Sequence, residues 1–188
     1  MSPIKFRQFL KRLRRDDQGS VLTEIALSIP LYITLFIGIV EVGHFLLLHL
    51  KAQHTVVAVA DLVTRDEEIS DDVMQDIFSA VPQIIAPYND AEDVVAIVSS
   101  VSQTADVPAS IFWQRIGGGG LSKESAFGAE GDPASLPDNF TMRDNETIIA
   151  TEIFYNYEPI LFDFLPTKTI RKVAYFRPRL GALQEIAS

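Results

Sequence analysis

The sequence GSVLTE at residues 19–24 and the apolar run from Ile25 to Leu50 that follows it decide the fold of this chain. At 1.5 Å per residue the run forms a helix about 39 Å long, against about 30 Å of bilayer hydrocarbon. One carboxylate, Glu24, stands just before the run, and a charge inside a membrane span costs roughly 2.5 to 3.5 kcal/mol on insertion scales. We therefore expect Glu24 to have a partner or a function, and the segment to be an assembly signal rather than an active site.

Charge is distributed unequally along the chain. Residues 1–19 hold six Lys or Arg and two Asp or Glu, whereas the rest of the chain holds ten basic and 23 acidic residues. Lys and Arg beside a spanning helix hold that side in the cytoplasm, so the acidic remainder is predicted to be exported, to the periplasm in a Gram-negative cell. Its composition argues against nucleic-acid binding, because phosphate contacts need clustered cations.

The junction at Gly19 resembles the class III (type IV prepilin) signal, in which a prepilin peptidase cuts after Gly and the fifth mature residue is Glu. Here the cut would fall between Gly19 and Ser20, which makes Glu24 the fifth residue. The stretches ALSIPL at residues 26–31 and GIVEVG at residues 38–43 are similar to the TadE-like proteins of tight-adherence pilus systems.

This resemblance implies a single-pass inner-membrane pseudopilin. Its implied partners are the prepilin peptidase, other pilin or pseudopilin subunits, the pilus inner-membrane platform and membrane lipid. It also implies two residues for subunit assembly, Glu24 and Glu41, of which Glu24 would meet the terminal amine of a neighbouring subunit. Glu41 lies about 26 Å beyond Glu24 along a helix, near the outer headgroups. It is either an interfacial, snorkelling carboxylate or a contact with another subunit, and the sequence leaves both open.

Three parts are predicted along the chain. Residues 1–19 form a basic leader that is removed, residues 20–65 a transmembrane and extended N-terminal helix, and residues 66–188 a periplasmic α+β domain. A flexible loop is expected within that domain at about 117–140, where Gly, Pro and Ser are frequent.

The exported domain is predicted to combine one helix with a roughly four-stranded antiparallel sheet. The helix is expected over residues 71–81, with Ser70 as N-cap and with Pro82 and Pro87 ending it. Four runs rich in β-branched or aromatic residues predict strands at 94–101, 111–116, 147–157 and 169–176. The simplest arrangement is a sheet with one apolar face covered by the helix.

No pattern typical of catalysis or cofactor binding is present. The chain has no Cys, and His44, His49 and His54 are spaced by five residues, which turns each about 140° around the helix from the last. These histidines therefore cannot converge on a metal within one helix. The glycine run at 117–120 lacks the G-x-x-x-x-G-K-[ST] phosphate loop. We predict a non-enzymatic protein without metal, cofactor or small-molecule substrate.

Several functions remain open from the sequence. The favoured one is a TadE-like minor pilin acting in assembly of a tight-adherence type IV pilus. The alternatives are a minor pseudopilin of a type II secretion system and an unprocessed, signal-anchored periplasmic binding module, which processing at Gly19 would distinguish. A Sec signal peptide fits less well, because its small cleavage-site residues follow an apolar core of about 7 to 15 residues, whereas here they precede a longer run.

Overall fold

The computed structural model describes residues 18–66, 68–88, 90–138, 140–161, 166–180, 183 and 186, with side chains from residue 21 onward. Its elements are α2 (Gln18–Val63), α3 (Asp71–Ile85), β1 (Val94–Thr104), β2 (Val107–Gly117), β3 (Glu146–Tyr157) and β4 (Lys168–Phe176). The predicted α+β class, with a long N-terminal helix and a four-stranded antiparallel sheet, is confirmed. Most of the predicted leader, residues 1–17, lies outside the described residues.

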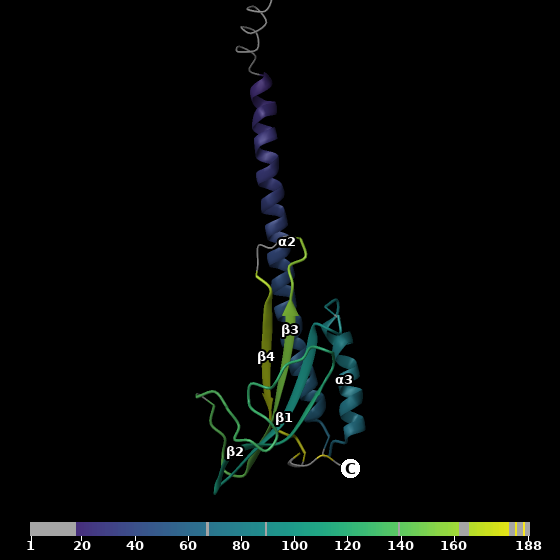
Figure 1. The fold of residues 1–188 in the computed structure, drawn as a ribbon, viewed down its shortest axis with the longest axis vertical. Helices are drawn as coiled ribbons and strands as arrows, with labels where there is room; N and C mark the ends of the chain where they lie inside the picture. The colour runs from purple at the N-terminus through teal and green to yellow at the C-terminus, as the bar shows by residue number, and fades with distance from the viewer. Residues whose placement is uncertain are drawn as a thin grey trace, which may run out of the picture.

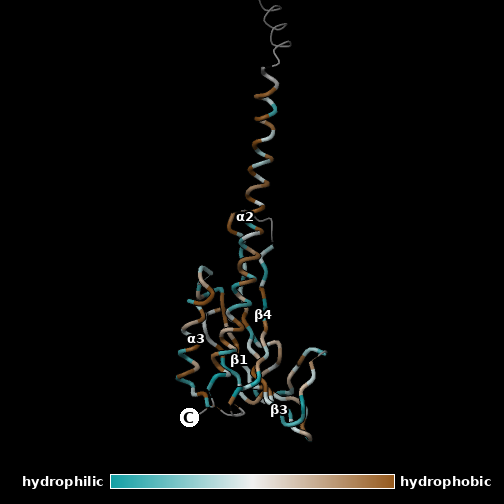
Figure 2. Tube along the Cα trace, turned by 180° about the vertical axis from the view of Figure 1, so that it is seen from behind, coloured by the Kyte–Doolittle hydropathy of each residue, from teal (hydrophilic) through white to brown (hydrophobic). Residues whose placement is uncertain are grey.

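Helix α2 has two halves with different surroundings (Figure 1). No residue from Val21 to Val40 is buried, and this half projects beyond the domain as an apolar rod (Figure 2). From Glu41 onward one side of the helix packs on the domain, where Leu48, Val56 and Val63 are fully buried. The apolar run from Ile25 to Leu50 therefore has two environments. None of its residues before Glu41 is buried, whereas one side of its last turns packs against the domain.

The sheet has the strand order β2-β1-β3-β4, and every neighbouring pair is antiparallel. The second half of α2 lies over β3 and β4, and α3 lies beside α2 and contacts β1 and β2. Val59 of α2, Val98 of β1 and Ile153 of β3 belong to one buried cluster. The predicted helix, α3, thus shares this face of the sheet with α2, which forms the larger part of the cover.

Helix α3 begins as predicted but ends later. The Ser70 hydroxyl caps it by accepting a hydrogen bond from the Val73 N–H at 3.3 Å, as expected for a serine N-cap. The helix continues through Pro82 to Ile85, so the predicted end at residue 81 is wrong. Near a helix end a proline removes a single intrahelical bond, and the complete burial of Val81 and Ile85 holds the last turn in place.

The described residues after β2 in the segment 117–140, namely 118–138 and 140, form neither helix nor strand, and many of them pack on the sheet. The N–H of Ile111 donates to the carbonyl of Asp132, and the Phe127 side chain is 1% exposed on the sheet face opposite the helices. Part of the glycine run is required by packing, since a Cβ on Gly119 would lie 2.1 Å from the Val94 carbonyl oxygen. The segment predicted as a flexible loop thus forms a layer of the domain.

The shared core predicts where a stable soluble fragment must begin. A fragment of residues 40–188 should unfold cooperatively, whereas residues 66–188 should not. The shorter fragment loses Leu48, Val56, Val59 and Val63, whose burial contributes on the order of 10 kcal/mol, comparable to the whole stability of a small domain. Urea unfolding followed by circular dichroism measures both fragments. Equal stability of the two would contradict the assignment of α2 to the core.

Candidate functional site

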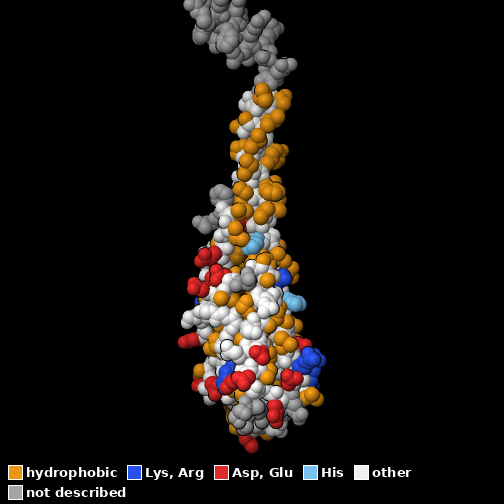
Figure 3. Space-filling model, turned by 90° about the vertical axis from the view of Figure 1, so that its right-hand side faces the viewer, with side chains coloured by type: hydrophobic (Ala, Val, Ile, Leu, Met, Phe, Trp, Pro, Cys, Tyr) orange, Lys and Arg blue, Asp and Glu red, His pale blue; other side chains and the backbone are white. Residues whose placement is uncertain are grey.

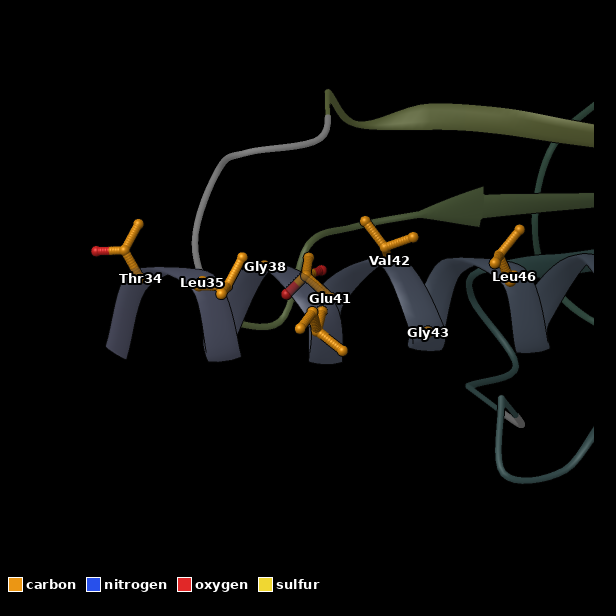
Figure 4. A pocket seen from close by; sticks show the side chains of 8 residues that line it. Thr34, Leu35, Gly38, Glu41, Val42, Gly43 and Leu46 are labelled. Carbon is orange, nitrogen blue, oxygen red and sulfur yellow. The ribbon is translucent and has the colours of Figure 1, made fainter. Parts of the chain in front are cut away.

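Glu41 is the most deeply buried charged residue of α2, at 1% exposure. Its carboxylate accepts the Tyr157 hydroxyl at 2.5 Å and the backbone N–H groups of Ile160 and Leu161 at 3.0 Å each. All three donors come from the end of β3 and the turn that follows it, which passes α2 beside Glu41 (Figure 4). A buried carboxylate is tolerated only when donors of this kind satisfy it, and charge-assisted bonds are the stronger ones.

Aromatic rings surround this carboxylate on the domain side. Phe45, one helical turn after Glu41, meets Tyr157 edge to face with ring centroids 5.0 Å apart. The Tyr88 hydroxyl donates to the His44 carbonyl at 2.8 Å, and its ring lies 4.6 Å from the His44 imidazole. Such ring pairs add to the apolar area that they bury. The start of the packed half of α2 is therefore held by both hydrogen bonds and ring contacts.

The tyrosines near Glu41 remain protonated at ordinary pH. Burial, followed by the hydrogen bond to Glu41, raises the pKa of the Tyr157 hydroxyl above its usual value. Burial, with Asp93 and Asp90 nearby, raises the pKa of Tyr155 to about 12. Tyr157 is consequently a permanent donor to Glu41, and the pair has the properties of a structural clamp rather than of a proton-transfer site.

The sequence-based site residues do not form one cluster. Gly19 and Ser20 lie in the first turn of α2, in the described backbone, but the Ser20 side chain lies outside the described part. Glu24 lies one turn later on the exposed surface of the helix, and 17 residues separate it from Glu41, which is about 26 Å of helix. The two carboxylates therefore mark opposite ends of the exposed apolar half.

The structure gives Glu41 partners that the sequence did not identify. Both of its carboxylate oxygens accept hydrogen bonds from its own chain, so the carboxylate is held by the domain and does not snorkel toward the headgroups. A contact between Glu41 and another subunit stays a prediction. Two of its donors are backbone N–H groups, which the identity of the residues in the sequence does not reveal. The aromatic end of β3 at Tyr157 is the one sequence feature that could have pointed to it.

A second buried carboxylate, Glu152, holds the segment 117–140 to the opposite face of the sheet. It is fully buried and accepts the Arg171 Nε at 2.6 Å and the Ala126 N–H at 3.3 Å, together with the Ser125 hydroxyl. The Arg171 guanidinium also lies 5.1 Å from the centre of the Phe127 ring, in cation–π range. Sequence analysis missed this role, because one acid within an apolar strand does not show which segment will cover it.

The three histidines have separate environments along α2. His44 contacts Tyr88, and the His49 ring lies 4.3 Å from Phe45, with Nδ1 at 3.0 Å from the Phe45 carbonyl. Within the residues that the structure describes, no group of three or more His, Cys, Asp or Glu side chains is placed to hold a metal ion. The contacts of His44 and His49 are those of packed helix residues.

Comparison with known protein families matches residues 19–61 to the family TadE-like protein. Residues 19–61 are a TadE-like segment. No curated protein and no solved structure gives a significant match. The predicted resemblance is thereby confirmed for this segment, which begins at Gly19 and includes both Glu24 and Glu41.

The TadE-like segment coincides with most of α2. Helix residues Val21–Val63 are long and apolar enough to cross a membrane, which indicates a single-pass anchor near the N-terminus. A TadE-like segment in such an anchor supports a role associated with the tight-adherence pilus. It covers both halves of the helix, the exposed rod and the part that packs on the sheet.

The Glu41 clamp predicts a specific loss of stability. Tyr157→Phe should lower the free energy of unfolding by about 1 to 3 kcal/mol, because it leaves a buried carboxylate without one donor. Thermal unfolding of the full chain in detergent micelles, followed by circular dichroism, measures the change. Tyr175→Phe is the matched control, since Tyr175 packs on Phe127 and Phe140 on the opposite face of the sheet. Equal effects of the two variants would argue against the clamp.

Proposed function

We propose that this chain is a non-enzymatic pseudopilin, a TadE-like minor pilin that acts in assembly of a tight-adherence type IV pilus. The observation that carries the proposal is the coincidence of the TadE-like segment with an exposed apolar helix that has Gly19 and Ser20 in its first turn. The exposed half can lie in lipid while the packed half holds the acidic domain outside it (Figure 3).

The proposed topology follows from charge. The six basic residues in 1–19 would stay in the cytoplasm, and the domain that follows α2 would lie in the periplasm. The prepilin peptidase would then meet the Gly19–Ser20 bond at the cytoplasmic end of the helix. Other pilin or pseudopilin subunits and the inner-membrane platform of the pilus would be its later partners.

Processing provides the first test of this function. In cells with an active prepilin peptidase, the protein should be cut after Gly19, so that Ser20 becomes the amino terminus. Mass spectrometry of the protein extracted from its native membrane identifies that residue. Gly19→Leu should retain the leader and serves as the control. An intact leader on the wild-type chain would contradict the proposal and favour an unprocessed, signal-anchored binding module.

Glu24 has a proposed role in assembly that depends on this cleavage. The new α-amino group of Ser20 has a pKa near 8 and is mostly cationic at neutral pH. Two opposite unit charges about 4 Å apart attract by about 1 kcal/mol in water and severalfold more at an effective dielectric constant near 20. An incoming subunit would therefore prefer the register in which its amine meets the Glu24 of its neighbour, because opposite charges attract more strongly where the effective dielectric constant is low.

Substitution of Glu24 tests the pairing separately from processing. Glu24→Leu should leave cleavage and membrane insertion largely intact but reduce pilus output and crosslinking to partner subunits. The reason is that Glu24 lies on the exposed helix surface, away from the domain core. Glu68→Leu, an exposed acid beyond the end of α2, is the matched control. Normal pili from a correctly processed Glu24→Leu protein would leave charge pairing without support.

A further inference from the structure

Among the described residues of the turn that follows β3, two large apolar side chains are exposed. Ile160 is 61% exposed and Leu161 is 48% exposed, although their backbone N–H groups are both bound to Glu41. Scattered exposed apolar residues are ordinary on protein surfaces. This pair differs because its backbone is bound to Glu41, the residue at which the exposed apolar half of α2 meets the domain. The turn passes the helix beside Glu41 (Figure 4).

The length of α2 sets the level of this turn relative to a membrane. The exposed half runs from Val21 to Val40, and these 20 residues span about 30 Å, which equals the hydrocarbon thickness of a typical bilayer. Glu41 is the next residue and is bound to the turn. When the exposed half fills the bilayer, Glu41, Ile160 and Leu161 therefore lie at its outer boundary.

The orientation of the sheet places this turn, and not the opposite end of the sheet, at the membrane. β3 ends near Glu41, and the turn between β1 and β2 lies at the far end of the domain (Figure 1). Gln103 near that far turn pairs with Glu146 at the beginning of β3, 11 residues before Tyr157, which is about 35 Å of strand. Val107, also exposed, is thus well outside the bilayer in this orientation.

We propose that the turn carrying Ile160 and Leu161 is a second membrane contact, which inserts its apolar side chains into the outer lipid interface beside the spanning helix. The Glu41 carboxylate is the positioning residue that fixes the turn at this level. Insertion of apolar side chains into the lipid interface is favourable, because it removes apolar area from water. Two points of attachment also restrict rotation of the domain about the axis of α2, so that one face of the sheet keeps a fixed orientation relative to the membrane.

The chain offers a clean experiment, because it contains no cysteine. Single cysteines at Leu161, Leu35 and Val107 are labelled with an environment-sensitive fluorophore in the full chain, reconstituted in phosphatidylcholine vesicles. Quenching is measured with lipids that carry a nitroxide at the headgroup, at a shallow acyl position or deep in the chain. Leu35 lies within the span and reports insertion, whereas Val107 is the exposed apolar residue outside it.

The label at Leu161 should be quenched severalfold more than the label at Val107, and most by the headgroup and shallow nitroxides. The label at Leu35 should respond most to the deep nitroxide. Quenching at Leu161 no greater than at Val107, with Leu35 quenched, would overturn the second contact and leave the anchor intact. An unquenched Leu35 would overturn the membrane span, on which this inference rests.

Two variants separate the positioning role of Glu41 from the contact itself. Glu41→Gln should reduce quenching at Leu161 while leaving quenching at Leu35 unchanged, and Glu68→Gln should change neither. Ile160→Asp keeps the backbone N–H that binds Glu41, so it should reduce quenching at Leu161 even if Glu41→Gln impairs folding. Unchanged quenching at Leu161 in the Ile160→Asp chain would count against insertion of this turn.

Discussion

A buried carboxylate must receive hydrogen bonds from the protein if water cannot supply them, and this constraint connects the middle of α2 to the end of β3. Glu41 meets it with donors from Tyr157, Ile160 and Leu161, which lie 116 to 120 residues later in the chain. The donors can reach Glu41 only if β3 ends at the level of the middle of α2. The position of the sheet along the helix is therefore tied to the hydrogen bonds that the Glu41 carboxylate needs.

The rest of the packing follows from that placement. With β3 ending at Glu41, the strand runs alongside the second half of α2, so that Val56, Val59 and Val63 face the sheet and are fully buried. The N-terminal half has no such cover and is largely apolar around its circumference, which is the composition expected of a membrane-spanning helix. One continuous helix thus has an exposed half and a half that packs on the sheet.

Much of this architecture could be predicted from sequence, since the elements have strong local signals. The apolar length of α2, the Ser70 cap and the β-branched runs identify the helices and all four strands. The end of α3 was missed because Pro82 is a strong local stop signal, while the burial of Val81 and Ile85 that overrides it is a tertiary effect. Local patterns cannot report how well a terminal turn will pack.

The strand register was harder to predict, and β4 shows why. Ile170 and Ala174 contact the helices, whereas Val173 and Tyr175 contact the packed segment 117–140 on the other face. A strand covered on both sides loses the alternation of apolar and polar residues from which a register is usually inferred. The burial of Glu152 could not be inferred for the same reason. Its partners Ser125 and Ala126 come from a segment whose composition is typical of a mobile loop.

The two carboxylates of the TadE-like segment, Glu24 and Glu41, differ in which groups their positions on α2 allow them to contact. Both lie on α2 near the limits of the exposed apolar half. The family resemblance implies contacts between subunits for both, although for Glu41 the sequence also left an interfacial carboxylate open. At Glu41 the domain is within reach, so hydrogen bonds within the chain can neutralise the cost of burying the charge. At Glu24 the domain is about 26 Å away along the helix, so the contacts that hold Glu41 lie far from it. Glu24 instead lies one turn from Ser20, at the end of the helix where, in the proposed assembly, the terminal amine of an incoming subunit would meet it.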